Sequence, residues 1–183
     1  MRVDWLPNLI SFLRIVLVPF VIAAILQGRY ELAFVLFFIA GFSDLLDGFL
    51  ARHFNWSTRL GSLLDPVADK LLVAGVFVSL AISGLIPVWL AVLVILRDLI
   101  IITGASVYNF MISRLDGSAT LLSKFNTGVQ GLYVLATLAT AAVGMPGDNI
   151  KNSLGILMVI TVVASGGHYV VSWARRATHE GRA

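Results

Sequence analysis

Long apolar runs separated by short polar breaks constrain this chain more than any other feature of its sequence. A membrane-spanning helix needs about 20 predominantly apolar residues in succession. Runs of this kind cover residues 9–26, 31–54, 59–83, 87–113, 124–143 and 150–173. The breaks between them contain turn signals such as Asp116-Gly117. We therefore expect an all-α integral membrane protein, a bundle of six transmembrane helices that forms one domain over residues 1–183.

The composition excludes several classes of protein. Of the 183 residues, 58% are hydrophobic and 13% are charged, whereas a soluble domain contains about 45–50% and about 25%, respectively. A soluble globular enzyme is therefore excluded. The chain has no cysteine, which excludes disulfides, thiolate metal sites and cysteine nucleophiles. The formal net charge of +3 is too small and too scattered for a nucleic-acid partner.

The distribution of lysine and arginine between the runs predicts the orientation in the membrane. Loops rich in these residues stay on the cytoplasmic side. One side of the expected bundle carries Arg2, Arg52, Arg59, Arg114, Lys124, Arg175, Arg176 and Arg182. The other side carries Arg29 and Lys151. We therefore expect a multi-pass protein with both termini in the cytoplasm, in the inner membrane if the source is bacterial.

Four aspartates lie inside two neighbouring spans, where ionisable side chains are costly and by default mark a function. Asp44 and Asp47 are three residues apart, and Asp65 and Asp69 are four apart, so each pair shares one helix face. With a rise of 1.5 Å per residue, antiparallel helices bring all four carboxylates to about 10–15 Å below the cytoplasmic helix ends. Such a pocket cannot stay fully ionised without cations. Its expected occupants are hard divalent ions, Mg²⁺ or Mn²⁺, and two such ions would suit displacement at a phosphate.

Other interpretations of buried acids stay open at this point. A single buried aspartate can be a hydrogen-bonded helix contact, and an acidic site can couple ions to transport. A transporter of that kind predicts discontinuous helices and internal repeats, and the sequence shows no repeat. Asp98 adjoins Arg97 within a span, so it can form an internal ion pair or serve a function. Lys70 points about 100° away from Asp69 around the helix, which favours a supporting role.

The two acidic helices carry an extended motif. It reads Asp44-Leu-Leu-Asp47-Gly48-Phe-Leu-Ala51-Arg52 and, after eight residues, Gly61-Ser-Leu-Leu-Asp65-Pro-Val-Ala-Asp69. This pattern resembles the signature of the CDP-alcohol phosphatidyltransferases, with every signature position filled. Residues 7–14 resemble the opening segment of that family, and the six-span layout also agrees. The resemblance covers most of the chain.

The resemblance implies roles for individual residues. Asp44, Asp47, Asp65 and Asp69 would bind two metal ions, and Asp69 would also act as the catalytic base. The expected contacts to the CDP group of the donor lipid are Asn8, Ser11, Asp44, Gly48, Ala51, Arg52, Thr58 and Gly61. Gly48 permits close approach of the backbone, which fits such a contact. For Arg52 the alternative is an arginine that extends to the membrane interface.

The family resemblance also implies the reaction. A phosphatidyl group would pass from CDP-diacylglycerol to an alcohol with release of CMP, and metal ions would neutralise the phosphate oxygens. A carboxylate would take the proton of the acceptor hydroxyl. Intramembrane prenyltransferases also bind metals and pyrophosphates in helical bundles. Their acidic motifs come in two distant copies, whereas this chain has one compact cluster.

Segments outside the signature favour phosphatidylglycerol as the acceptor, with cardiolipin as the product. They are residues 41–49, 83–88, 97–98 and 123–130, which resemble the cardiolipin-forming branch of the family. The alternative acceptor is glycerol 3-phosphate, which gives phosphatidylglycerophosphate and needs a compact cationic pocket. Candidate acceptor-binding residues are Arg59, Arg97 and Lys124, although Lys124 also fits a role in orientation alone. The resemblance further implies a homodimer.

Overall fold

The computed structural model describes the backbone of residues 6–54, 59–111 and 121–180, and the side chains of residues 12–43, 69–104, 121–167 and 169. These backbone segments form six helices and contain no strand. The helices are α1 (Leu6–Leu26), α2 (Tyr30–Phe54), α3 (Arg59–Ile82), α4 (Val88–Met111), α5 (Leu121–Val143) and α6 (Asp148–Glu180). The expectation of an all-α protein is therefore confirmed for the described part of the chain.

The helix boundaries lie close to the expected ones, with one clear difference at the C-terminus. The sequence predicted a polar tail after Trp173, but α6 continues to Glu180. No glycine or proline interrupts the residues between these positions, and alanine and arginine favour the helix. The length of an apolar run predicts the apolar part of a helix. The helix itself can continue through polar residues that favour helical structure, as it does here.

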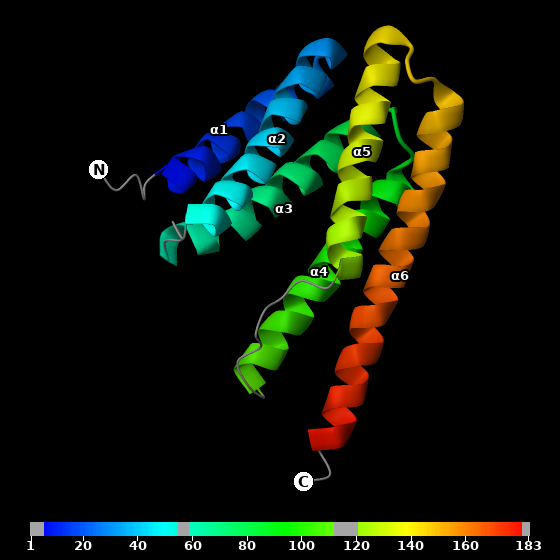
Figure 1. Ribbon diagram of the computed structural model, residues 1–183. Helices are drawn as coiled ribbons and strands as arrows, with labels where there is room; N and C mark the ends of the chain where they lie inside the picture. Colours follow the sequence, from blue (N-terminus) through cyan, green and yellow to red (C-terminus); the bar gives the residue numbers. More distant parts are fainter. Residues whose placement is uncertain (1–5, 55–58, 112–120, 181–183) are drawn as a thin grey trace.

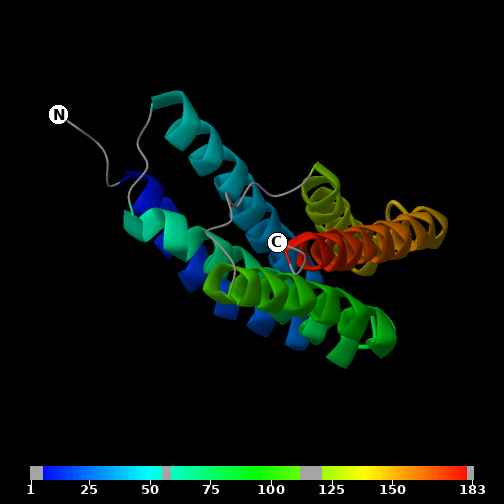
Figure 2. The ribbon, with the colours of Figure 1, turned by 90° about the horizontal axis from the view of Figure 1, so that it is seen from below.

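The helices contact one another in a closed order that differs from their order in the chain. α1 packs against α2 and α3, and α2 also packs against α5. α5 packs against α6, α6 against α4, and α4 against α3. Figure 1 shows α1 to α3 as one group beside α5 and α6, and Figure 2 shows the same bundle from below. This order makes α5 a neighbour of α2, although α3 and α4 lie between them in sequence.

Two glycines with the same backbone conformation follow the ends of α1 and α3. Gly28 and Gly84 have φ of 72°, a region that side chains disfavour. After α1, the Arg29 amide donates to the Ala24 carbonyl at 2.9 Å. After α3, the Leu85 amide donates to the carbonyl of residue 80 at 3.0 Å. These bonds satisfy carbonyls that a helix end leaves free, and they allow tight turns into α2 and α4.

The apolar core fills the half of the bundle near these turns. Its most deeply buried large side chains are Val21, Ile25, Val76, Phe77, Leu80, Val94, Val134, Leu138, Met158 and Val162. Gly75 allows α3 to approach α1, because a Cβ there would lie 2.7 Å from Cδ1 of Ile22. The four aspartates of the motif lie in the opposite halves of α2 and α3. The bundle therefore has an apolar half and a half that carries the polar motif.

Large apolar side chains also face outward on all six helices. Examples that are more than half exposed are Phe20, Phe38, Ile82, Trp89, Leu132 and Ile156. Within the described side chains, the stretch Asp148–Gly167 is long and apolar enough to cross a membrane, whereas Phe12–Leu26 and Tyr30–Ser43 are apolar but shorter. One candidate span is thus found in that part of the chain, against six expected. Two of the expected spans pass through residues 44–68, whose side chains lie outside it.

A buried ion-pair network joins α3, α4, α5 and α6. The side chain of Arg97 is 4% exposed, and its guanidinium donates to Oδ1 of Asp98 at 2.7 Å. It also donates to the hydroxyls of Ser123 at 2.8 Å and Ser165 at 2.5 Å. Nζ of Lys70 lies 2.8 Å from the other carboxylate oxygen of Asp98. Asp98 is therefore an internal ion-pair residue that serves two cations.

Replacement of Asp98 tests the importance of this network for stability. Asp98→Ala leaves the charges of Arg97 and Lys70 without their carboxylate, so we expect the free energy of unfolding to fall by about 3–5 kcal/mol. The control is Asp148→Ala, which removes an ion pair to Lys151 in which the aspartate side chain is 74% exposed. That change should cost about 1 kcal/mol or less. Unfolding of each variant in detergent, followed by the loss of helical circular dichroism, measures both changes in the free energy of unfolding. Equal changes for the two variants would contradict the assignment of Asp98 to a buried ion pair.

Candidate functional site

The acidic motif occupies two consecutive helices. Asp44 and Asp47 lie in the C-terminal half of α2, and Asp65 and Asp69 lie in the N-terminal half of α3. Both helices pack against α1, and they run in opposite directions (Figure 1). This backbone arrangement brings the two halves of the motif toward the same end of the bundle.

Most of the residues predicted for the site lie outside the described side chains. They are Asn8, Ser11, Asp44, Asp47, Gly48, Ala51, Arg52, Thr58, Arg59, Gly61 and Asp65. Their roles stay predictions. The structure describes the side chains of Asp69, Arg97 and Lys124, and these three connect the motif to its surroundings.

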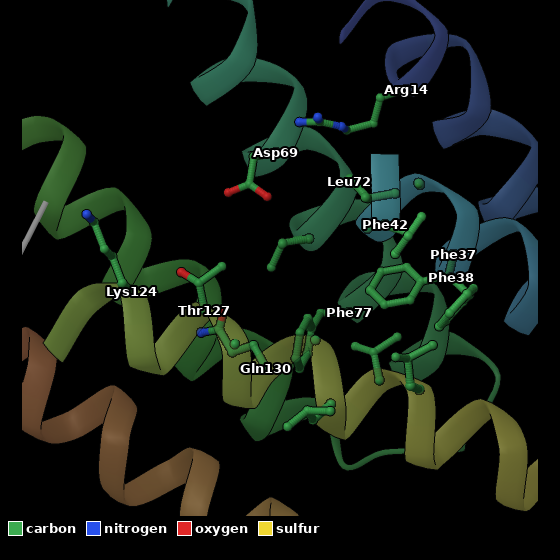
Figure 3. Close-up of a pocket in the computed structure, with 18 of the residues that line it drawn as sticks. Arg14, Phe37, Phe38, Phe42, Asp69, Leu72, Phe77, Lys124, Thr127 and Gln130 are labelled. Atoms are coloured by element: carbon green, nitrogen blue, oxygen red, sulfur yellow. The ribbon is translucent and has the colours of Figure 1, made fainter. Parts of the chain in front are cut away.

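Asp69 lies on the wall of a cavity of about 630 Å³. The lining comes from α1, α2, α3 and α5, with the largest share from α5. The carboxylate of Asp69 points away from the α3 backbone, on the side of α3 that faces α5 (Figure 3). The volume is within the range of about 300–1,000 Å³ that is typical of sites for small molecules. Asp69 thus borders a space of the size that small ligands occupy.

The cavity is polar at one end and apolar at the other. Asp69, Lys124 and Thr127 direct polar atoms toward the same open region in Figure 3. The rings of Phe37 and Phe77 lie farther along the cavity, toward the apolar core. Such a division suits a ligand with a charged or hydroxylated head and an apolar body.

One face of α5 forms much of the cavity wall. Lys124, Thr127, Gly128, Gly131 and Leu135 line it, and their spacing of three to four residues places them on one side of a helix. The hydroxyl of Thr127 donates to a carbonyl one turn earlier, at Ser123, which satisfies that proton within the helix. The Thr127 hydroxyl oxygen and the Lys124 ammonium are among the polar groups that α5 places along the cavity.

Arg97 has a different position from the one expected of an acceptor-binding residue. It is not among the residues that line the cavity, and its guanidinium contacts Asp98, Ser123 and Ser165. Ser123 does line the cavity. Arg97 therefore supports the wall from behind, through Ser123. A sequence shows that an arginine is inside a span, but not which way its long side chain turns.

Among the cavity residues absent from the predicted site, two are buried polar side chains, Arg14 and Gln130. Arg14 on α1 is 1% exposed and lines the cavity; an ionisable residue within a span was the signal that could have identified it. Gln130 is 2% exposed and also lines the cavity. Its position within residues 123–130, singled out above, was the available signal. Both add polar groups to the cavity lining, Arg14 on the side of Asp69 and Gln130 beside Thr127 (Figure 3).

The donor set of the acidic motif fits hard divalent cations. Within the described side chains, no three histidine, aspartate or glutamate residues lie together so as to hold a metal. Of the motif's aspartates, only Asp69 belongs to that part. Four carboxylates spaced three and four residues apart supply only oxygen ligands, which magnesium and manganese prefer. The residues present therefore fit the expected metals in chemistry.

Comparison with known proteins gives consistent results. Residues 4–167 match the family model of CDP-alcohol phosphatidyltransferase. Cardiolipin synthase (CMP-forming) of Rattus norvegicus is 35% identical over 180 residues, 90% of this chain and 60% of that protein. The Homo sapiens protein of the same name is 34% identical with the same coverage. A probable phosphatidylglycerophosphate synthase of Mycobacterium tuberculosis is 32% identical over 145 residues, 73% of this chain and 68% of that protein.

These similarities extend well beyond the acidic motif. The family match runs from the segment before α1 into α6. The chain spans about 60% of the length of the rat and human relatives. The motif on α2 and α3 and the match over most of the sequence lead to the same assignment: this chain belongs to the CDP-alcohol phosphatidyltransferase family.

Proposed function

We propose that this chain transfers the phosphatidyl group of CDP-diacylglycerol to phosphatidylglycerol, forming cardiolipin and releasing CMP. The observation that carries the proposal is the position of Asp69, which lies in the acidic motif and also on the wall of a cavity. A base at this position can meet a hydroxyl in the cavity and a phosphate held by the motif. The similarity to proteins named cardiolipin synthase (CMP-forming) supports this acceptor.

The reaction is a displacement at the phosphorus that bears the diacylglycerol. The terminal glycerol hydroxyl of phosphatidylglycerol forms a new bond to this phosphorus, and the bond between phosphorus and the CMP oxygen breaks. Asp69 takes the proton of the attacking hydroxyl, as a general base does. Cardiolipin and CMP are the products, so atoms and charge balance without an oxidant or a further reactant.

The metal and nucleotide contacts belong to the same proposal. Asp44, Asp47, Asp65 and Asp69 would hold two Mg²⁺ or Mn²⁺ ions, which supply charge neutralisation at the phosphates when bound. The CDP group would contact the segments around Asn8, Ser11 and Gly48, together with Ala51, Arg52, Thr58 and Gly61. These residues lie at or near the same end of α1, α2 and α3 as the acidic motif, which suits a single donor site.

A membrane location suits both lipid substrates. The outward apolar side chains on all six helices favour a bundle in which each helix crosses the bilayer. The excess of lysine and arginine on one side of the expected bundle supports placing both termini and the donor site toward the cytoplasm. We extend the proposal to one domain over residues 1–183 and, from the family resemblance, to a homodimer. Exposed apolar surface of this extent is typical of contact with lipid or with another chain.

Glycerol 3-phosphate is the second candidate acceptor. The similarity to a protein named probable phosphatidylglycerophosphate synthase supports it, and Arg14 and Lys124 lie on the cavity. The largely apolar body of the cavity favours phosphatidylglycerol, because a compact dianion needs converging charged donors rather than phenyl rings. Arg97 does not line the cavity, so it is not among the acceptor contacts that we propose.

Metal removal tests the donor site. Activity should disappear when the purified protein is treated with a chelator, because the phosphate charges are then not neutralised. It should return on addition of Mg²⁺ or Mn²⁺. Formation of CMP from CDP-diacylglycerol measures both steps. Full activity of metal-stripped protein would contradict the role of the four aspartates.

Substitutions within the motif distinguish the proposed catalytic base from the aspartates that are expected to bind metal without acting as the base. Asp69→Asn should lower kcat on the order of 10²–10⁴-fold, because an amide cannot accept the hydroxyl proton. CDP-diacylglycerol binding should largely survive. Asp44→Asn should also raise the Kd for CDP-diacylglycerol, since this residue is expected to contact both metal and donor. A near-normal rate for Asp69→Asn would show that another group is the base.

Separate reactions with the two acceptors test the choice between them. With CDP-diacylglycerol as donor, phosphatidylglycerol should give cardiolipin and CMP, and glycerol 3-phosphate should give little lipid product. Mass spectrometry of the extracted lipids identifies each product. Phosphatidylglycerophosphate formed at a comparable rate would overturn the acceptor but not the family or the release of CMP.

A further inference from the structure

Three glycines border open space along the cavity. Gly41 on α2 and Gly128 and Gly131 on α5 all line the cavity, and a Cβ at any of them would meet no atom within 4 Å. Gly155 is different, because a Cβ there would lie 3.1 Å from the ring of Tyr133. That glycine serves close helix packing. The three cavity glycines meet no neighbour. Gly128 is exposed and Gly41 and Gly131 are half-buried, so these glycines widen the open side of the cavity.

A buried amide borders this volume. Gln130 is 2% exposed, and its Nε2 has no hydrogen-bond partner within the described part of the chain. The side chain lines the cavity, and Figure 3 shows it beside Thr127. An unpartnered buried donor is unfavourable unless a ligand or water satisfies it. The amide therefore points to a polar ligand group at this depth.

The cavity reaches the outer surface between α2 and α5. Phe38, Phe42 and Leu132 line it and are each about half exposed, at 51%, 52% and 55%. α2 and α5 pack against each other, so the opening lies along their contact. A long apolar chain can pass from the surrounding lipid through this opening, while a head group reaches Lys124 and Asp69.

We infer that this cavity binds the acceptor lipid, with the glycerol phosphodiester at Lys124 and Gln130 and one acyl chain over Gly128 and Gly131. The inference rests on the proposed function and adds where the acceptor lies. The donor contacts expected from the family resemblance are on α1 to α3 and the segment between α2 and α3, whereas α5 supplies the largest share of this cavity. An in-line displacement brings the attacking hydroxyl from the side opposite CMP, which suits an acceptor held by α5.

Filling the glycine space tests the acyl position. Gly131→Leu places a side chain where a Cβ meets nothing within 4 Å, so the fold should tolerate it. We expect the KM for dioleoyl-phosphatidylglycerol to rise at least tenfold, the KM for dihexanoyl-phosphatidylglycerol to rise less than threefold, and the KM for CDP-diacylglycerol to stay within twofold. The matched control is Gly167→Leu on α6, also without a neighbour within 4 Å and not on the cavity; all three values should stay within twofold.

Removing the amide tests the head-group position. Gln130→Leu keeps a similar size but cannot donate a hydrogen bond. The KM for the dioleoyl and dihexanoyl acceptors should rise by a similar factor, at least fivefold, because both share the head group. The dependence on chain length therefore distinguishes the two substitutions, and a general loss of structure would not produce that contrast.

Binding to the wild-type protein gives a measurement that needs no variant to fold. Phosphatidylglycerol with a diazirine near the end of one acyl chain should label residues 128–135 after illumination, and unlabelled phosphatidylglycerol should suppress the label. A label elsewhere, or suppression by CDP-diacylglycerol alone, would overturn the inference. A rise in the KM of Gly131→Leu or Gln130→Leu for CDP-diacylglycerol would also overturn it, because the cavity would then bind the donor.

The experiments separate this inference from the proposed function. If the wild-type protein makes no cardiolipin from phosphatidylglycerol, the proposed function and the inference both fail. If it makes cardiolipin and Gly131→Leu leaves every KM unchanged, only the position of the acceptor fails. Cardiolipin synthesis together with the chain-length contrast supports both.

Discussion

The structure depends on how ionised side chains are accommodated in a bundle that is apolar inside and out. A buried charge is tolerated when a partner charge and hydrogen bonds satisfy it. Asp98 meets this requirement through Arg97 and Lys70, and the bonds of Arg97 to Ser123 and Ser165 extend it to α5 and α6. Lys70 directly follows Asp69, and Ser123 directly precedes Lys124. The network therefore anchors both walls of the cavity next to the two residues that we propose to face its ligand.

Much of the fold was predictable because apolar length and turn chemistry act locally. The runs that begin near Leu9 and Glu31 became α1 and α2, and the turn at Gly28 lies where the break was expected. The extension of α6 to Glu180 was not predicted, since hydropathy marks only the end of the apolar run and a helix can continue into water. The closed order of helix contacts could not be predicted from the sequence either, because it depends on contacts between distant segments.

The site was predictable in its chemistry but only partly in its geometry. The spacing of Asp65 and Asp69 indicates a shared face without any structure, as helix periodicity requires. Whether Arg97 faces a ligand or the interior depends on side-chain direction, and the structure directs it to Asp98. Gln130 acquires its importance only from burial beside an open volume. Such a volume exists where glycines leave out a side chain. A glycine in the sequence does not reveal whether it borders a cavity or serves close helix packing.

Placing donor and acceptor on different helices would separate the reaction chemistry from the choice of acceptor. On our proposal, the carboxylates of α2 and α3 handle the pyrophosphate of the donor, whichever alcohol attacks it. The α5 face presents Lys124 near the motif and Gly131 farther into the apolar half. Enlarging a side chain on that face would remove room for an acyl chain without touching the carboxylates. An acceptor without acyl chains would not need that room, so the open space over Gly128 and Gly131 is a physical reason to prefer a lipid acceptor in this chain.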